Sequence, residues 1–470
     1  MTHVHLIGIG GAGLSAIARV LLEKGETVSG SDRTLSALAQ AVQEAGARVY
    51  LGHKAENIAG ADVVVRSSAI GEENVEIQAA LAQGIPVLKR AEFMPYLVGG
   101  QRCIAVAGTH GKTTTTAMIA WMLTATGQDP SFIVGSLVTN LKRNAGAGKG
   151  LMFVIEADEY DRMFHGLDPN IAVVTNIEHD HPDCYPTEAD FRQAFLEFAR
   201  RLRTEGVLLT CMDDQGARWL HAQMAQSGKQ VLTYGLNRGL GYTGPDFVGR
   251  SLQTNQEGGF DFEFASRLAS NQGQEKAVKV RLQVVGRHNV LNATAALAVG
   301  ELLHLPREEA AEALAEFRGT ARRFEIRGEA QGVLVIDDYA HHPTEIRATL
   351  AAARGRYPAR EIWAVWQPHT YSRTRALFNG FIHAFADTDH VVVLDVYAAR
   401  ETPPTDGFSS REIARAIQHN DVHYLPDLLQ SPAWLIERLQ PGSLVLVLSA
   451  GDADQLSRGV LVGLGEQIMN

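Results

Sequence analysis

Short apolar runs alternate with longer amphipathic or alanine-rich segments along most of the chain, a pattern typical of α/β proteins. The apolar runs predict strands at residues 3–9, 27–31, 61–66, 84–88, 103–106, 153–155, 171–175, 333–336, 362–366, 391–394 and 444–448. The longer segments predict helices at residues 14–22, 117–123 and 290–303. The glycine- and polar-rich stretch 235–280 contains alternating phenylalanines and then alternating aliphatic residues, so we expect a small antiparallel sheet there.

The length of the chain, 470 residues, exceeds what one hydrophobic core holds, so several domains are expected. We predict an N-terminal Rossmann-like domain over residues 1–98, ending before Gly99 and Gly100. A central P-loop ATPase-like domain is expected over residues 99–318 and would contain the small antiparallel sheet. A second Rossmann-like domain is expected over residues 319–470. The fold class is therefore α/β with three domains.

The composition argues against several classes of function. The net charge is −10 and there is no long basic run, which argues against a nucleic-acid partner. Three cysteines without a C-x-x-C spacing suggest neither a disulfide framework nor a structural zinc site, and fit a reducing cytoplasm. The N-terminus lacks the pattern of a signal peptide, and no apolar run reaches the length of about 18 residues that a membrane-spanning helix needs.

The stretch Ala107–Thr116, A-G-T-H-G-K-T-T-T-T, has the layout of a phosphate-binding loop between a strand and a helix. Its two glycines, Gly108 and Gly111, allow a tight turn whose N–H groups face phosphate oxygens. Lys112 can reach the terminal phosphates, and the Thr113 hydroxyl can bind Mg²⁺. Val106 stands where the common motif has glycine, so the loop is a shorter variant. The alternative is a glycine turn at a helix start with a solvated lysine.

A second glycine loop opens the chain. Gly8, Gly10 and Gly13 form G-x-G-x-x-G between a predicted strand and helix, and Asp32 follows at the distance where a Rossmann unit contacts a ribose. The turn Ser67-Ser68 comes after another strand. This context predicts a nucleotide diphosphate site, and leaves open whether the ligand is NAD or a UDP-sugar.

Polar clusters also follow other strands, at the sheet edge where parallel α/β proteins bind ligands. They read E-A-D-E-Y-D from Glu156, T-N-I-E-H-D-H from Thr175, D-D-Y-A-H-H-P-T from Asp337 and Q-P-H-T-Y-S-R-T from Gln367. A carboxylate at such a place is a natural Mg²⁺ ligand, and a solvated loop charge is the alternative. His288 and Asn289 could contact a base, or Asn289 could cap the following helix. For the histidines before Pro343, the alternative is packing against that proline.

Together with G-I-G-G-A-G-L-S from Gly8 and G-R-H-N-V-L-N-A from Gly286, these motifs resemble the Mur ligases over the whole chain. The similarity is greatest to the branch that joins L-alanine to the lactyl carboxylate of UDP-N-acetylmuramate in peptidoglycan precursor synthesis. It implies UDP-substrate, ATP and amino-acid domains, ATP and Mg²⁺ or Mn²⁺ as cofactors, and an acyl-phosphate intermediate.

The resemblance also implies roles for individual residues. The implied ATP-binding residues are Gly108, Thr109, His110, Gly111, Lys112, Thr113, Thr114, His288, Asn289, Asn292, Arg323 and Asp338. The implied UDP-substrate residues are Gly8, Gly10, Gly11, Ala12, Gly13, Ser15, Asp32, Ser67 and Ser68. Thr113, Glu156 and His181 would serve the metal, and His369 and Arg373 the amino acid. Lys112, His181, His341 and Arg373 are the expected catalytic residues, and either His181 or His341 could be the general base.

Three other functions compete with this one. A nucleotide-dependent oxidoreductase would explain the first glycine loop but not the second, because hydride transfer needs no γ-phosphate. A non-catalytic ATP switch would not need an amino-acid site. Within the family, a ligase that adds a recycled tripeptide to the same UDP-sugar is the closest alternative. The sequence is compatible with a monomer or a homodimer.

Overall fold

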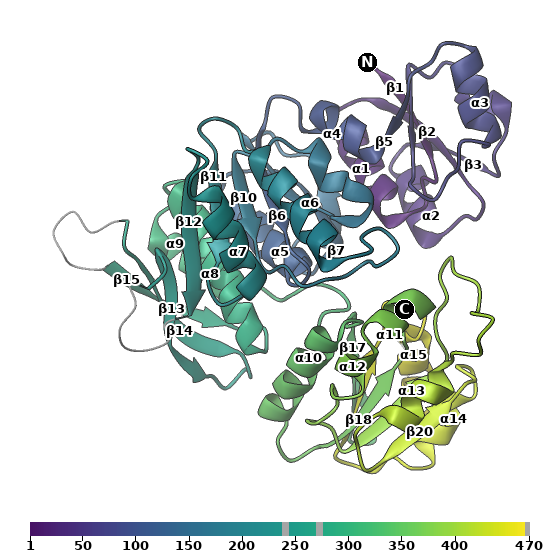
Figure 1. Cartoon of the computed structure of the whole chain (residues 1–470), viewed down its shortest axis with the longest axis vertical. Helices are drawn as coiled ribbons and strands as arrows, with labels where there is room; N and C mark the ends of the chain where they lie inside the picture. The colour runs from purple at the N-terminus through teal and green to yellow at the C-terminus, as the bar shows by residue number, and fades with distance from the viewer. Residues whose placement is uncertain (237–243, 269–275, 466–470) are drawn as a thin grey trace.

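The computed structural model describes residues 1–236, 244–268 and 276–465. These residues form three separate sheets in sequence order (Figure 1), spanning residues 3–89, 102–282 and 325–448. Both predicted domain boundaries lie between these sheets. No helix in the described part of the chain is long and apolar enough to cross a membrane.

The N-terminal sheet has five parallel strands in the order β3-β2-β1-β4-β5. Its strands are β1 (His3–Ile7), β2 (Thr27–Asp32), β3 (Arg48–Leu51), β4 (Val63–Arg66) and β5 (Val87–Lys89). Its helices are α1 (Ala12–Glu23), α2 (Ala37–Glu44), the short η1 (Ala55–Ile58), α3 (Val75–Ala82) and α4 (Arg90–Val98). The strand order reverses between β1 and β4, so the loops after these two strands open side by side, as in Rossmann folds.

The central sheet has ten strands in the order β15-β14-β13-β12-β11-β10-β6-β9-β7-β8. Its strands are β6 (Arg102–Ala107), β7 (Ser131–Val138), β8 (Arg143–Gly146), β9 (Met152–Glu156), β10 (Ile171–Val174), β11 (Val207–Cys211), β12 (Gln230–Leu236), β13 (Phe247–Thr254), β14 (Phe260–Ser266) and β15 (Lys276–Leu282). Its helices are α5 (Lys112–Ala125), η2 (Tyr160–Gly166), α6 (Glu188–Arg200), α7 (Gln215–Met224), α8 (Arg287–Leu302) and α9 (Arg307–Ala315).

The antiparallel strands predicted after residue 235 are confirmed as β13, β14 and β15. They do not form a sheet of their own, because β13 pairs in parallel with β12 and so extends the central sheet. Residues 237–243 and 269–275 of the glycine-rich stretch lie outside the described residues. The strand predicted at 3–9 ends at Ile7, and the one predicted at 84–88 covers Val87–Lys89, so their outer residues belong to loops.

The C-terminal sheet has the order β16-β17-β21-β18-β19-β20 and is parallel except for β16. Its strands are β16 (Glu325–Ala330), β17 (Val333–Asp338), β18 (Glu361–Trp366), β19 (His390–Leu394), β20 (Val422–Leu425) and β21 (Ser443–Leu448). Its helices are α10 (Pro343–Arg356), α11 (Tyr371–Ala376), α12 (Phe378–Phe381), α13 (Ser410–Ala416), α14 (Ser431–Ile436) and α15 (Asp454–Gly463).

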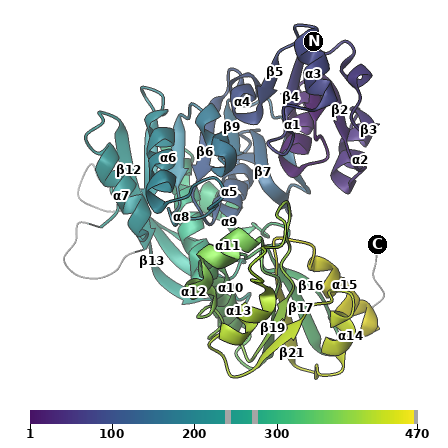
Figure 2. The same ribbon diagram turned by 45° about the vertical axis from the view of Figure 1, so that its right-hand side comes forward.

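The three domains are joined by two different kinds of contact. One apolar cluster continues from Val4 and Phe93 of the N-terminal domain to Phe153 and Phe164 of the central domain, so these two domains share a core. The apolar clusters of the C-terminal domain, in contrast, contain only residues of that domain. Its α10 and α11 lie on the side that faces the central domain (Figures 1 and 2). Polar side chains make the contact between these two domains.

Candidate active site

The central glycine loop joins β6 to α5 as the sequence predicts, and its two glycines are sterically required. Gly108 has φ 142°, and a Cβ there would lie 1.9 Å from the Thr175 hydroxyl oxygen. Gly111, in the left-handed region at φ 78°, is the N-cap of α5, and a Cβ would meet the Asn292 side chain at 2.7 Å. Since no other residue fits these positions, the loop keeps its backbone close to its neighbours at the helix N-terminus.

Lys112 lies at the first position of α5 and is mostly buried. Its ammonium group donates to Glu159 Oε1 at 2.9 Å and to the carbonyls of Gly108 and Thr109. Burial lowers the pKa of Lys112, but Glu159 and Glu156 outweigh this effect and raise the pKa above its usual value. The lysine therefore stays charged. Glu159 is a residue that our sequence reasoning missed, although it belongs to the E-A-D-E cluster that we singled out.

Thr113 and Glu156, two of the three predicted metal ligands, are in direct contact. Thr113 Oγ1 donates to Glu156 Oε1 at 3.0 Å, and the Gly135 N–H donates to the other carboxylate oxygen at 2.6 Å. Burial raises the pKa of Glu156, against the effect of Lys112. The third predicted ligand, His181, lies beyond Glu159, with its Nε2 3.6 Å from Glu159 Oε1. Among the described residues, Thr113 contacts Glu156 while His181 contacts Glu159, so the three predicted ligands do not form a closed triad.

One cavity of about 310 Å³ collects most of the predicted ATP-binding residues. Those that line it are His110, Gly111, Thr113, Thr114, His288, Asn289, Asn292, Arg323 and Asp338. The lining also includes residues that the sequence did not single out, among them Asp213, Asp214 and Tyr234. The cavity lies between the central and C-terminal domains, because Arg323 and Asp338 come from the latter.

Asn289 does not cap α8, which was one of the two roles that the sequence allowed for this residue. The N-cap of α8 is Gly286, and Asn289 does not cap the helix, because its amide donates to the Val285 carbonyl and accepts from Asn292 at 2.9 Å. Burial lowers the pKa of His288 to about 4, so its imidazole is neutral at the cavity wall. Neutral ring and amide groups suit an uncharged ligand part such as a base.

Side chains from several segments of the N-terminal domain hold its glycine loop in place. The Gly10 N–H donates to Asp32 Oδ2 at 2.9 Å, so the carboxylate braces the loop, and its contact with a ribose stays a prediction. Ser15 donates to the Ala12 carbonyl. Ser67 lies against Gly8, since a Cβ added to Gly8 would be 3.1 Å from the Ser67 Cβ. The half-buried Ser68 follows it. α1 begins at Ala12 with Gly11 as its N-cap.

A second cavity, of about 230 Å³, extends from the N-terminal glycine loop to Glu156 of the central domain. On one side it is lined by Ala12 and Gly13 of the N-terminal loop, together with Arg90. On the other side it is lined by Glu156, the residue that also contacts Thr113 of the central loop. The cavity therefore leads from the first loop to a side chain that contacts the second.

Changing Gly10 to valine is expected to raise the Michaelis constant for a UDP-sugar and to leave that for ATP nearly unchanged. The added Cβ would lie 2.8 Å from Ser36 Oγ and 2.9 Å from Asp32 Oδ2, so the loop must move. Steady-state kinetics with each substrate varied in turn would measure this. Gly100→Val is the matched control, because nothing lies within 4 Å of a Cβ there. An equal rise for ATP would contradict the assignment.

The predicted amino-acid residues meet at the seam between the central and C-terminal domains. Arg373 is buried, and its Nε and Nη2 donate to the two oxygens of Asp180 at 2.7 and 3.3 Å, while its Nη1 donates to His369 at 2.8 Å. The guanidinium is thus already paired within the protein, and its predicted contact with the amino acid stays a prediction. Arg373 holds the pKa of Asp180 well below its usual value, although burial acts in the opposite direction.

His341 and His369 are neutral neighbours of this pair. Burial lowers the pKa of His341 to about 3 and that of His369 to about 4, and their rings lie 5.8 Å apart. His341 also contacts the Tyr339 carbonyl at 2.9 Å. The other histidine before Pro343, His342, is the N-cap of α10 and accepts from the Thr344 N–H.

A second polar contact across the seam involves His110 of the central loop. Its Nε2 lies 3.0 Å from Glu178 Oε2 in the central domain, and its Nδ1 lies 3.3 Å from Glu345 Oε1 in α10. Burial lowers the pKa of His110, but the two carboxylates outweigh this and raise it to about 9. Neither Glu178 nor Glu345 was predicted, since nothing in the local pattern pairs residues so far apart.

Comparisons with known proteins agree with this organisation. Three family models match consecutive parts of the chain: Mur ligase family, catalytic domain at residues 3–102, Mur ligase middle domain at 106–300, and Mur ligase, glutamate ligase domain at 322–451. A UDP-N-acetylmuramate–L-alanine ligase of Roseiflexus sp. (strain RS-1) is 43% identical over 99% of this chain and 100% of its own length.

Solved structures show the same relationship. The UDP-N-acetylmuramate–alanine ligase MurC of Thermotoga maritima has a TM-score of 0.80 at 26% identity, over 98% of this chain and 99% of that one. The UDP-N-acetylmuramate:L-alanyl-γ-D-glutamyl-meso-diaminopimelate ligase of Neisseria has a TM-score of 0.60 at 27% identity, over 68% of this chain and 100% of that one. With three matched domains and full-length similarity, the chain belongs to the Mur ligase family.

Proposed function

We propose that this chain is an ATP-dependent ligase that joins L-alanine to the lactyl carboxylate of UDP-N-acetylmuramate, the activity for which its full-length relatives are named. The observation that carries this proposal is the position of Glu156. It lines the cavity that begins at the N-terminal glycine loop, and it contacts Thr113 of the ATP loop. A carboxylate at the end of a UDP-bound substrate can therefore reach the γ-phosphate of ATP.

The reaction has two steps, and each makes a demand on these residues. A carboxylate is a poor acylating agent, so its oxygen first attacks the γ-phosphorus of ATP and forms an acyl phosphate, with ADP leaving. This step brings two anions together, and the charged Lys112 offsets their repulsion. The amine of L-alanine then attacks the carbonyl, and phosphate leaves. That amine must be neutral, so a base has to take its proton.

His181 is the better of the two candidates for this base. Burial lowers the pKa of His341 to about 3, which leaves a weak base. For His181, burial also acts to lower the pKa, but Asp180 and Glu159 outweigh it and raise the pKa. His181 also lies next to Arg373, whose Nη2 donates to its Nδ1 at 3.3 Å. We therefore assign proton removal to His181 and positioning within the seam to His341.

The residues around Glu156 fit a hard divalent cation. Hydroxyl and carboxylate oxygens are the ligands that Mg²⁺ prefers, and Glu159 Oε2 is buried nearby without a hydrogen-bond partner among the described residues. Thr113 and Glu156 would hold the ion, and His181, to which we assign proton removal, contacts Glu159 and not these two residues. Bound there, Mg²⁺ or Mn²⁺ would neutralise charge on the phosphates.

Removal of the metal should abolish activity. We expect no phosphate release in excess EDTA, and full recovery when Mg²⁺ is added in excess of the chelator, because the anionic phosphates and Glu156 would otherwise face each other uncompensated. Recovery with Mn²⁺ is expected as well. Full activity in EDTA after dialysis against the chelator would rule out the metal.

The decisive test of the proposed function compares acceptors. Phosphate release is measured with saturating ATP and UDP-N-acetylmuramate, and with either L-alanine or L-Ala-γ-D-Glu-meso-diaminopimelate. We expect a higher kcat/KM with L-alanine, and poor activity with glycine and L-serine, because one methylene changes binding by only about 1–3 kcal/mol. A higher kcat/KM with the tripeptide would move the assignment to the recycling ligases. We further propose that the reaction takes place in the cytoplasm, which suits the three free cysteines.

A further inference from the structure

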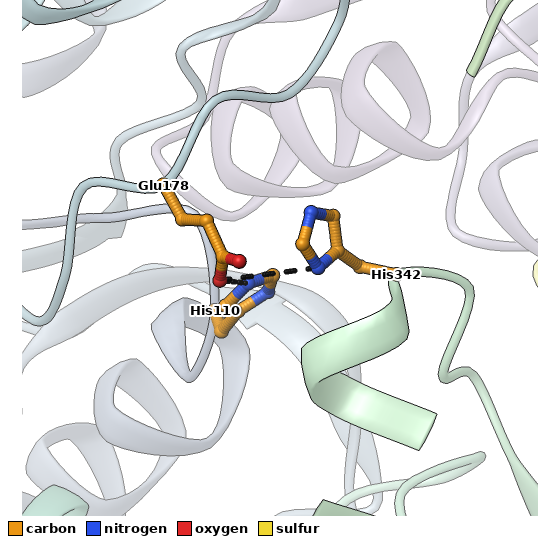
Figure 3. Close-up of side chains that lie close together, drawn as sticks. All are labelled: His110, Glu178 and His342. Atoms are coloured by element: carbon orange, nitrogen blue, oxygen red, sulfur yellow. Dashed lines mark hydrogen bonds and ion pairs between the residues drawn. The ribbon is translucent and has the colours of Figure 1, made fainter. Parts of the chain in front are cut away.

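Two imidazoles and a carboxylate converge at the seam between the central and C-terminal domains, separate from the Thr113–Glu156 contact. His110 comes from the ATP loop, Glu178 follows β10, and His342 precedes α10 (Figure 3). Glu178 Oε2 lies 3.0 Å from His110 Nε2 and 3.9 Å from His342 Nδ1. One ligand atom from each of the three residues can be chosen so that all lie within 4.8 Å of one another.

The surroundings of these three side chains are those of a transition-metal site. Metal-binding histidines commonly give their second ring nitrogen to a carboxylate, and His110 Nδ1 lies 3.3 Å from Glu345 Oε1. The other oxygen of Glu178 accepts from the Thr344 hydroxyl at 2.9 Å, which orients the carboxylate. In tetrahedral zinc sites with bonds of about 2.0–2.1 Å, neighbouring ligand atoms lie about 3.3–3.4 Å apart, so small shifts suffice here.

His342 provides an independent observation. Its Nδ1, which lies 3.9 Å from Glu178 Oε2, accepts from the Thr344 N–H at 3.3 Å, so this nitrogen carries the lone pair of the neutral ring and exchanges that long hydrogen bond for the metal. The ring is buried, and its Nε2 has no hydrogen-bond partner among the described residues.

We propose that His110, Glu178 and His342 bind one transition-metal cation, for which Zn²⁺ is the representative, at the domain seam. Two imidazoles and one carboxylate are a common zinc ligand set with a fourth position left for water. Mg²⁺ prefers oxygen ligands and so does not compete well here. The cation links the C-terminal domain to the central domain, because His342 belongs to the former and the other two ligands to the latter.

This linkage has a consequence for turnover. Among the residues that the structure describes, the C-terminal domain shares no apolar cluster with the other two domains, and polar contacts hold the seam. A cation bound to both sides stabilises the closed arrangement, by the general rule that a ligand favours the state it binds. Given the proposed ligase activity, Zn²⁺ therefore inhibits turnover even when Mg²⁺ is saturating, because it holds the two domains in the arrangement that it binds.

The experiment uses the full-length chain without a histidine tag. Binding of Zn²⁺ is measured by calorimetry in the presence of excess Mg²⁺, and the visible spectrum of the Co²⁺-loaded protein reports its coordination. His342→Asn is the main variant, since asparagine keeps an N-cap acceptor for α10 but removes the imidazole. Glu178→Gln is the second, because its amide oxygen can still accept from Thr344. His423→Ala is the matched control, since His423 Nε2 lies 3.0 Å from Asp421 Oδ1, away from the seam.

We expect one Zn²⁺ per chain, an intense tetrahedral Co²⁺ spectrum, and binding weakened by more than roughly 100-fold in His342→Asn, since even outer-shell changes cost 10–100-fold. His423→Ala should bind as the wild type does. Equal binding by wild type and His342→Asn would overturn the proposal, as would loss of binding in His423→Ala. X-ray absorption of the wild-type zinc complex tests it without any variant: fewer than two imidazole ligands would also reject it. None of these measurements depends on ligase activity.

Discussion

Replacing Lys112 with alanine is expected to lower kcat roughly 10³-fold, the scale found when a charge that stabilises a transition state is removed. Lys112 is positioned at the start of α5 by Glu159 and by two loop carbonyls, and we propose that its ammonium group faces the phosphates of ATP. Phosphate release with all three substrates saturating would measure the effect. Turnover close to that of the wild type would contradict the assignment of this loop to ATP.

The structure also predicts a loss of stability in this variant, which the sequence did not suggest. Glu159 is 1% exposed, and without Lys112 the one charged partner left to its carboxylate in the described part of the chain is His181, at 3.6 Å. Breaking a buried pair by removing one partner costs about 3–5 kcal/mol. The matched control is Lys112→Ala combined with Glu159→Gln, which removes the unpaired charge. Urea unfolding should show recovered stability in the double variant, while its kcat stays low.

Arg373→Lys is expected to lower kcat/KM for L-alanine roughly 100-fold or more, since disturbing a buried, hydrogen-bonded charge pair costs about 2–5 kcal/mol. Arg373 contacts Asp180 on one side and His369 on the other, and a lysine cannot reach both because its ammonium is a single point charge. Steady-state kinetics with L-alanine varied would show the loss. A kcat/KM within a few-fold of the wild type would refute a role for the guanidinium.

Asp180→Asn completes a double-mutant cycle with this substitution. If Asp180 acts by orienting Arg373, the double variant should lose little more activity than the worse single variant, so the two effects should not add. Additive losses would mean that Asp180 has a role of its own, such as contact with a substrate. Unfolding curves of the same four proteins separate this coupling from a common loss of stability.

Local sequence pattern determined which segments become the binding loops. Gly108 and Gly111 predicted a tight turn because only glycine adopts that backbone beside its neighbours, and the structure places both at the start of α5. The polar clusters after strands were predicted to gather at one edge because the carboxyl ends of parallel strands point the same way. Strands such as β11 were not predicted because no motif follows them, although their residues are mostly apolar.

Tertiary structure alone decided how these loops act together. Arg373 and Asp180 are 193 residues apart, and whether the guanidinium lies open or paired depends on how the C-terminal domain packs against the central one. The same packing brings His110 to Glu345, and the shared core of the first two domains brings Glu156 to the cavity that begins at Gly13. Hydrophobic periodicity specifies which face of an element is buried, but not which distant side chain meets it, because many domain arrangements bury the same faces.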